Sequence, residues 1–214
     1  MKFSIEELRP TRNGMTISRD SKLGNSTKLT YFSMGKDTSI SQESYDRMTM
    51  YIGASGWGEF IIGEEPEIIK LQPDELLIVP AGTLCGMQTS NGIVYTEIIC
   101  TGKDINMNAN VKTNEVFALK NLISYEEGSI ANMDVVSTPD MKYVLMAFDE
   151  GTGLTPHRAP GNAIVFALEG KATIGYEGKD YELSEGECFR FEKNGLHSVT
   201  ANGKFKMALL LVLE

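Results

Sequence analysis

The chain has 214 residues, of which 42% are apolar and 23% charged, so it can bury one large hydrophobic core or two smaller ones, and disorder is not expected. A net charge of -9 argues against a basic surface for nucleic acid or for acidic membranes. No apolar run approaches the roughly 20 residues of a bilayer span, and residues 1–10 do not form a signal-peptide core. The 3 cysteines form no CxxC pair, which suits a reducing compartment, so we expect a cytoplasmic protein. Because of the charge and the short apolar runs, we expect neither nucleic-acid nor membrane partners.

In chain order, the first expected element is a helical turn or two near residues 5–8, and the rest consists of short apolar runs between turn residues. In the first half, residues 76–79 (LLIV) precede a turn at residues 80–82, and residues 93–100 follow Asn91-Gly92. The length of these runs and their content of β-branched and aromatic residues predict strands.

The second half repeats this rhythm with more apolar runs. The predicted strands are residues 142–148, 163–168, 171–176, 188–191 and 205–213, and turn residues such as Asn202-Gly203 separate them. The continuous run AIVFAL at residues 163–168 predicts a strand that is covered on both faces. Many short strands at regular spacing predict an all-β sandwich or barrel architecture.

The sequence also matches itself at an offset of 112 residues. Tyr31 aligns with Tyr143 and Gly58 with Gly170, and the turns keep their spacing over a long ungapped stretch. A polar, asparagine-rich segment that ends at residue 114 separates the two copies. We therefore predict two tandem β-barrels, formed by residues 1–102 and 115–214, with residues 103–114 as the linker.

Two motifs in the second half resemble those of the cupin superfamily. Gly151, His157 and Gly170 have the spacing of the first cupin motif, whereas Ala159 and Ala163 occupy the positions of its second histidine and its glutamate. The second motif is represented by the glycine at position 186 and by the histidine at position 197. Four residues of the first half stand at the corresponding ligand positions: Tyr45, Arg47, Tyr51 and Cys85.

The resemblance implies a two-domain (bicupin) protein made of jelly-roll barrels, also called double-stranded β-helices, each with an internal pocket. Cupins typically hold a divalent metal there with three histidines and one glutamate. In this chain His157 and His197 are the expected metal ligands, for Zn, Ni, Mn or Fe. A third ligand would come from Asp149, Glu150 or Glu177, or from substrate and water. Alternatively, the two histidines are hydrogen-bonded within a cavity that holds no metal.

The small side chains of Ala159 and Ala163 leave space beside the two histidines, and this space is a candidate ligand pocket. The alternative is that larger neighbours such as Phe166, Phe189 or Met207 fill it.

In the first half, Tyr45, Arg47, Tyr51 and Cys85 are expected to line a second pocket. Cys85 is expected to be an inert core residue rather than a reactive thiolate activated by Arg47. An arginine inside a barrel needs an anionic partner, which would be Glu43 or the carboxylate of a ligand.

Two functions of different classes remain. The favoured hypothesis is a bicupin that binds a small molecule inside the C-terminal barrel, with a divalent metal at the two histidines as a further possibility. The alternative is a metal-dependent cupin enzyme, an isomerase, lyase or dioxygenase that acts on a small organic acid, sugar or aromatic compound. Cupins often pair through sheet faces or end strands, so a homo-oligomer, most simply a homodimer, is expected.

Overall fold

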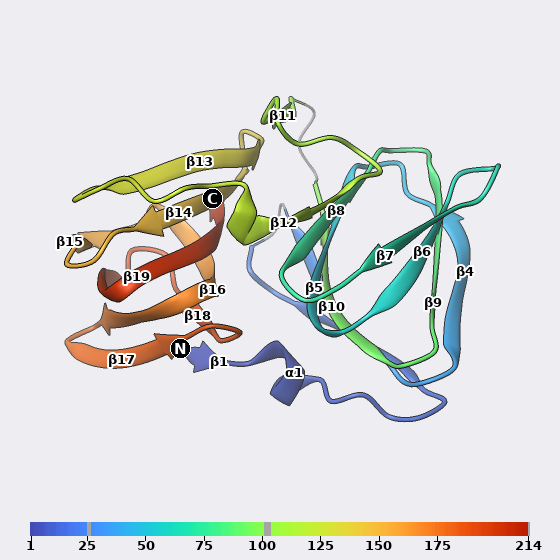
Figure 1. Ribbon diagram of the computed structural model, residues 1–214, viewed down its shortest axis with the longest axis horizontal. Coiled ribbons are helices and arrows are strands. Elements are labelled where there is room, and N and C mark those ends of the chain that lie inside the picture. The colour runs from blue at the N-terminus through green and yellow to red at the C-terminus, as the bar shows by residue number, and fades with distance from the viewer. Residues whose placement is uncertain (25–26, 101–103, 214) are drawn as a thin grey trace.

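The computed structural model describes residues 1–24, 27–100 and 104–213, and these residues form an all-β protein (Figure 1). Within this part of the chain, helix is limited to α1 (Ile5–Leu8) and to the 3-10 turn η1 (Leu119–Asn121). No helix of the described residues is long and apolar enough to span a membrane. The predicted boundary between residues 102 and 103 lies outside the described residues.

The first half of the chain forms two facing sheets, which lie on the right of Figure 1. The larger one has 6 strands in the order β12 (Val116–Ala118), β8 (Glu75–Val79), β5 (Thr49–Gly56), β10 (Ile93–Ile99), β3 (Lys28–Met34) and β2 (Thr16–Ser21). The smaller one has 4 strands in the order β4 (Thr38–Ser44), β9 (Leu84–Thr89), β6 (Gly58–Ile62) and β7 (Glu67–Leu71).

The second half forms a sheet of 9 strands, on the left of Figure 1. Its main path is β1 (Lys2–Phe3), β18 (Cys188–Phe191), β16 (Gly161–Tyr176), β19 (Leu196–Leu213), β14 (Met141–Phe148), β13 (Ile130–Ser137) and β11 (Asn106–Met107). Two further strands join this path, β15 (Gly153–Arg158) on β19 and β17 (Lys179–Ser184) on β16. All the strand pairs are antiparallel.

The strands repeat at the same offset of 112 residues that the sequence shows. Thr49, Glu67 and Leu84, which begin β5, β7 and β9, correspond to the first residues of β16, β17 and β19. The strand order β8-β5-β10-β3-β2 in the first half corresponds to β18-β16-β19-β14-β13 in the second. The repeated sequence pattern therefore reflects a repeated strand arrangement.

Each half receives an edge strand from the other half of the sequence. Strand β1 pairs with β18, while β12 pairs with β8. Between β1 and the first-half sheets lies α1, where Ile5 is buried, and the Ser4 side chain caps its N-terminus (Figure 1). These exchanged edges tie the two halves together, because removing either edge strand exposes the border of a sheet.

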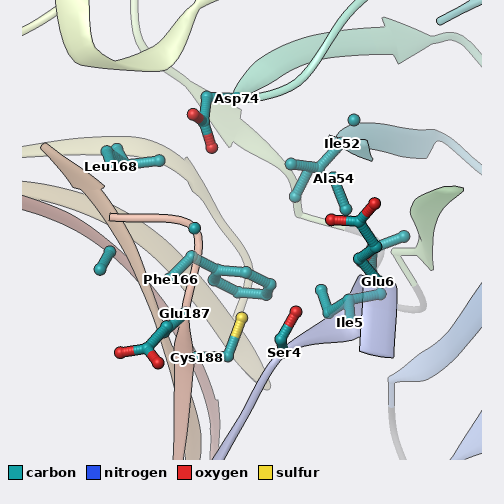
Figure 2. A pocket seen from close by; sticks show the side chains of 14 residues that line it. Ser4, Ile5, Glu6, Ile52, Ala54, Asp74, Phe166, Leu168, Glu187 and Cys188 are labelled. Atoms are coloured by element: carbon teal, nitrogen blue, oxygen red, sulfur yellow. The ribbon is translucent and has the colours of Figure 1, made fainter. Parts of the chain in front are cut away.

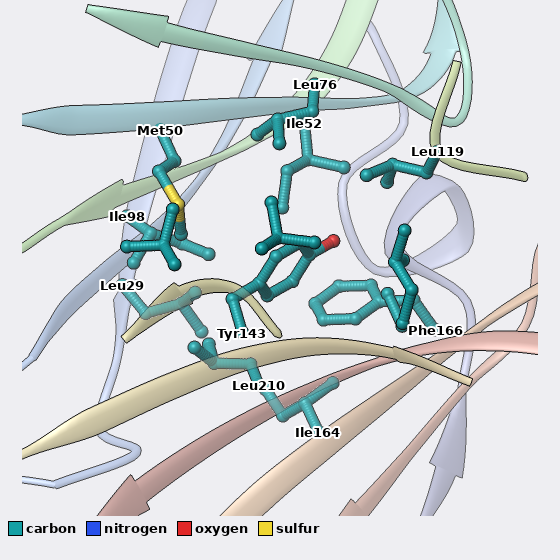
Figure 3. Close-up of a cluster of buried hydrophobic side chains, with 14 of the residues drawn as sticks. Leu29, Met50, Ile52, Leu76, Ile98, Leu119, Tyr143, Ile164, Phe166 and Leu210 are labelled. Carbon is teal, nitrogen blue, oxygen red and sulfur yellow. The ribbon is translucent and has the colours of Figure 1, made fainter. Parts of the chain in front are cut away.

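The largest hydrophobic cluster lies between the two halves (Figure 3). Its fully buried members include Leu29 and Met50 from the first half and Tyr143, Ile164 and Leu210 from the second. The large first-half sheet is therefore buried on both faces, since its opposite face packs against the smaller sheet around Phe60, Leu77 and Tyr95. The halves therefore share the largest core, and each half also buries a smaller cluster of its own.

The prediction that AIVFAL is covered on both faces is confirmed. Ile164, Phe166 and Leu168 face the shared core, whereas Ala163 and Val165 pack into the second-half interior. The prediction of a turn at Asn202-Gly203 is wrong, because both residues lie inside the continuous strand β19. Gly203 has a φ of 88°, which glycine adopts without strain, so the strand bends there without reversing.

Candidate functional site

The two histidines of the chain face each other at one end of the second half. His157 on β15 and His197 on β19 are direct partners across the strand pair, and their ring centroids are 4.3 Å apart. His197 is buried and stacks on Phe191 with a centroid separation of 4.2 Å, whereas His157 is exposed. The pair therefore sits where the second-half interior opens to solvent, and His197 also lines an open pocket beside Tyr176 and Glu177.

Hydrogen bonds fix the same tautomer on both rings. His157 Nδ1 lies 2.8 Å from the carbonyl oxygen of Thr155, and His197 Nδ1 lies 2.9 Å from that of Gly195. Because a carbonyl only accepts, each Nδ1 carries the hydrogen and each neutral ring has its lone pair on Nε2. Burial lowers the pKa of His197, the hydrogen bond to the Gly195 carbonyl offsets part of this, and the adjacent His157 lowers the pKa again. His197 is therefore predominantly neutral at pH 7, as metal binding requires.

A third protein ligand is not in place beside this pair. Among the described residues, no group of three or more His, Cys, Asp or Glu side chains is arranged to hold a metal ion. Of the donors expected from the sequence, Glu177 accepts a hydrogen bond from the backbone of Leu196 and pairs with Arg158 at 3.8 Å. Asp149 accepts from the Gly128 backbone instead. The residues thus supply two of the three ligands that a resident metal normally has.

Side chains fill the space beside the small residues of the second half. Ala163 is 1% exposed and belongs to the same buried cluster as Phe189, Phe191 and Met207. Ala159 follows β15, is half-buried, and its carbonyl accepts a hydrogen bond from Asn194. For Ala163, the alternative of close packing by larger neighbours is the one that the structure shows.

The first half contains a cavity of about 200 Å³ between its two sheets. It brings together three of the four residues selected from the sequence, Tyr45, Tyr51 and Cys85. Strands β5 and β10 supply Tyr51 and Tyr95 from one wall, and β9 supplies Cys85 from the other. In volume it is smaller than typical drug-sized pockets, so it suits a small organic molecule.

Aromatic rings form much of the cavity wall. Tyr51 lies 4.7 Å from Phe60 and 6.1 Å from Tyr95 by ring centroids, and Phe32 stacks on Tyr95 at 4.9 Å. These contacts hold the rings in one arrangement, because neighbouring aromatic side chains in tilted or stacked contact restrict each other. The wall is therefore preorganised for a ligand with an apolar surface.

One carboxyl group lies deep in this cavity. Glu97 on β10 is 4% exposed, and its Oε2 accepts a hydrogen bond from the Tyr45 hydroxyl at 3.4 Å. Burial raises the pKa of Glu97 to about 6, and the positive charge of Lys28 limits the rise. A second carboxyl group, that of Glu43, is exposed and belongs to the lining as well.

Cys85 lines the cavity as a protonated thiol. Burial raises its pKa to about 11, and a hydrogen bond from Tyr51 offsets part of the rise. At neutral pH the nucleophilic thiolate is therefore rare. This agrees with the interpretation of Cys85 as an unreactive residue.

Arg47 does not share the cavity with these residues. It lines a different pocket together with Asp46, Met48 and Pro80. The expectation of one pocket with all four residues came from their alignment with the cupin ligand positions, but residues 45–48 lie between β4 and β5, outside the regular strands. Alternation does not apply in such a segment, so Arg47 is directed away from the Tyr51 cavity.

A smaller cavity of about 90 Å³ lies between the two halves, under α1 (Figure 2). Its lining includes Asp74, Phe166 and Cys188, which Figure 2 shows around one space. Thr96 also lines it, is 0% exposed, and its hydroxyl has no hydrogen-bond partner among the described residues. Burial raises the pKa of Asp74 to about 6.

Four further residues of the first-half cavity were not predicted from the sequence: Glu97, Phe32, Phe60 and Tyr95. The available signal was a single glutamate within the apolar run IVYTEII of β10, because a charge in a strand covered on both faces is rarely tolerated without a role.

Residues 144–213 match the family model of the cupin domain. Among solved structures, a Cupin 2 conserved barrel domain protein from Leptotrichia buccalis is 24% identical, with a TM-score of 0.87, and the match covers 99% of this chain and 96% of that chain. The family match covers residues 144–213, and the likeness to the solved structure shows that the chain has the same fold. The sequence has no significant match among curated proteins.

Two groups of enzymes have a more distant likeness in fold. A mutant of salicylate 1,2-dioxygenase from Pseudoaminobacter salicylatoxidans is 10% identical, with a TM-score of 0.66 and coverage of 87% of this chain and 70% of that chain. A mutant of oxalate decarboxylase from Bacillus subtilis is 13% identical, with a TM-score of 0.58 and coverage of 100% and 77%. At these identities the likeness shows the fold alone.

Proposed function

We propose that this chain is a small-molecule-binding protein of the cupin fold and that its ligand occupies the first-half cavity. The observation that carries the proposal is Glu97, a carboxyl group buried among aromatic rings in a cavity of about 200 Å³. Burying an ionisable group costs stability, so a group of this kind in a cavity is a functional-site candidate. The second-half interior is a weaker candidate, because side chains fill the space beside Ala163.

We also propose that the architecture is a bicupin, with one barrel in each half. The repeat of strand order at an offset of 112 residues supports this, as do the two cupin-like motifs of the second half. The shared core makes the two barrels one folding unit, and the exchanged strands β1 and β12 cross the division at residues 103–114 that the sequence predicts.

A second candidate function is a metal-dependent cupin enzyme of the isomerase, lyase or dioxygenase class. It is favoured by one observation, the adjacent imidazoles of His157 and His197 on paired strands, each with its Nδ1 at a backbone carbonyl. Two imidazoles with water fit a loosely held Zn, Ni, Mn or Fe ion, but not a resident metal with three protein ligands. A bound metal would act as a Lewis acid at the open end of the second half.

Three free cysteines support the proposal of a reducing, cytoplasmic location. A homo-oligomer remains a prediction from the behaviour of cupins.

The proposal is tested by a thermal-shift screen of small amines, sugars, phenols and carboxylic acids. Compounds that bind the native state raise the melting temperature, and the stabilisation grows with the logarithm of their concentration over Kd. Cys85→Phe fills the cavity, and Cys85→Ser keeps its volume. We expect ligands that stabilise the wild type and Cys85→Ser but not Cys85→Phe. Equal stabilisation of Cys85→Phe would place the ligand elsewhere.

A further inference from the structure

We propose that the first-half cavity selects a small organic cation, one that presents an amine or quaternary ammonium group to Glu97. This inference rests on the proposed function, because it names the ligand class of the same cavity. Three features support it: the charges that face the cavity, the aromatic rings that line it, and the incomplete pairing of the buried carboxyl group.

The charges that face the cavity are all acidic. Glu97 lies at its inner wall and Glu43 is exposed, and none of the described lining residues is basic. The thiol of Cys85 and the phenol of Tyr51 remain neutral at pH 7, because burial raises the pKa of both groups. An anionic ligand would meet like charge here, whereas the net charge of -9 attracts cations to the protein as a whole.

Arg47, the residue expected from the sequence to receive a ligand carboxylate, belongs to another pocket. The first-half cavity therefore does not suit the small organic acid that the sequence suggested as a possible substrate.

The aromatic wall suits the same ligand class. Tyr51, Phe60 and Tyr95 contact one another and all line the cavity. The negative face of an aromatic ring attracts ammonium groups, and this attraction increases when the site excludes water. Rings together with a carboxylate therefore provide both the apolar contact and the counter-charge that an alkylammonium ion needs.

The buried carboxylate is itself incompletely compensated. Within the described residues, its hydrogen bonding is limited to the long contact of 3.4 Å from Tyr45, and a positive charge comes from exposed Lys28, at the start of the neighbouring strand β3. Buried charges are normally paired and fully hydrogen-bonded. A cation in the cavity would supply the missing partner, so its binding would also lower the pKa of Glu97.

The test is isothermal titration calorimetry with three probes of similar size: choline, its neutral isostere 3,3-dimethyl-1-butanol, and benzoate. The proteins are the wild type, Glu97→Gln and, as a matched surface control, Glu67→Gln, whose carboxylate is exposed on β7. We expect the wild type and Glu67→Gln to bind choline at least tenfold more tightly than the isostere. Glu97→Gln should lose at least tenfold in choline affinity and leave that of the isostere unchanged.

Tighter binding of benzoate or of the isostere than of choline would overturn the cation selectivity and leave the proposed cavity in place. Unchanged choline affinity in Glu97→Gln would likewise overturn the role of Glu97 in cation selectivity and leave the proposed cavity in place. If no compound of the thermal-shift screen binds and the three probes also fail, both this inference and the proposed function are wrong.

Discussion

The Tyr45 hydroxyl donates a hydrogen bond to Oε2 of Glu97, and both residues line the cavity between the two first-half sheets. The two residues are 52 positions apart in the sequence. Burial and the neighbouring Glu97 carboxylate raise the pKa of Tyr45 to about 12, so the phenol stays a donor at neutral pH, and its hydrogen bond in turn lowers the pKa of Glu97. The carboxylate is thus held in place while one side remains open to a ligand.

Stability should depend on pH through Glu97. Its pKa rises from 4.5 to about 6 on folding, mainly by burial, with contributions from Lys28, Tyr45, Asp20 and Glu43. Between these values the folded protein keeps a proton that the unfolded chain has released, so the free energy of unfolding falls as the pH rises through this window. Glu97→Gln should therefore raise the free energy of unfolding by about 2 kcal/mol at pH 7.5 and change it little at pH 4.

Urea denaturation of both proteins at the two pH values measures this difference. Glu67→Gln serves as the control. Because this side chain is exposed, the substitution should change the free energy of unfolding by less than about 0.5 kcal/mol at either pH. A loss of stability in Glu97→Gln at pH 7.5 would show that the carboxylate is well compensated in the absence of ligand.

Metal uptake should depend on both histidines. After incubation with Zn²⁺ or Ni²⁺ and brief gel filtration, the wild type should retain at most weakly held metal, with Kd values typical of two ligands rather than three. His157→Ala should abolish this uptake without loss of stability, because His157 is exposed. If elemental mass spectrometry found stoichiometric, tightly bound metal in the wild type, this would reveal a third ligand and favour the enzyme hypothesis.

The shared core predicts a single cooperative unfolding transition. Leu210 is fully buried among residues of both halves, so Leu210→Ala should cost about 2–5 kcal/mol and lower one common melting temperature. Differential scanning calorimetry distinguishes this from two independent domains. Two resolved transitions, only one of which moves in the variant, would contradict the shared core.

Tyr143 lies in the same core, and a substitution there should stabilise the protein, in contrast to Leu210→Ala. Its ring is 0% exposed, and its hydroxyl has no hydrogen-bond partner among the described residues. Removing a buried unpaired hydroxyl relieves a desolvation cost, so Tyr143→Phe should raise the free energy of unfolding by about 1 kcal/mol. A lower free energy of unfolding for Tyr143→Phe, measured by chemical denaturation, would mean that the hydroxyl has a hydrogen-bond partner, for instance an ordered water.

The sequence predicted the strands of the second half because their apolar content is continuous. Residues 188–191 form β18 as expected, and AIVFAL is buried on both faces. The sequence did not predict what covers those faces, since a run of apolar residues does not distinguish a domain interior from a shared interface. The repeat indicated two copies, but the exchange of β1 and β12 follows from edge pairing that no local pattern records.

The candidate site was predicted in part. His157 and His197 meet as expected, because equivalent positions on paired strands become neighbours. Tyr45, Tyr51 and Cys85 share a cavity, but Arg47 does not, since it lies in a bend where alternation fails. The residues that decide the chemistry of this cavity, Glu97 and the rings around it, stand outside the motif positions and were not selected.

The location of the ligand is tested most directly by NMR of methyl-labelled methionines during titration with a compound from the thermal-shift screen. Met87 lines the first-half cavity, while Met207 lies in the second-half cluster and Met48 borders the pocket of Arg47. We expect the Met87 methyl resonance to shift with ligand and to saturate, and those of Met48 and Met207 to stay in place. A saturating shift at Met207 with Met87 unchanged would contradict the account and return the binding site to the second half.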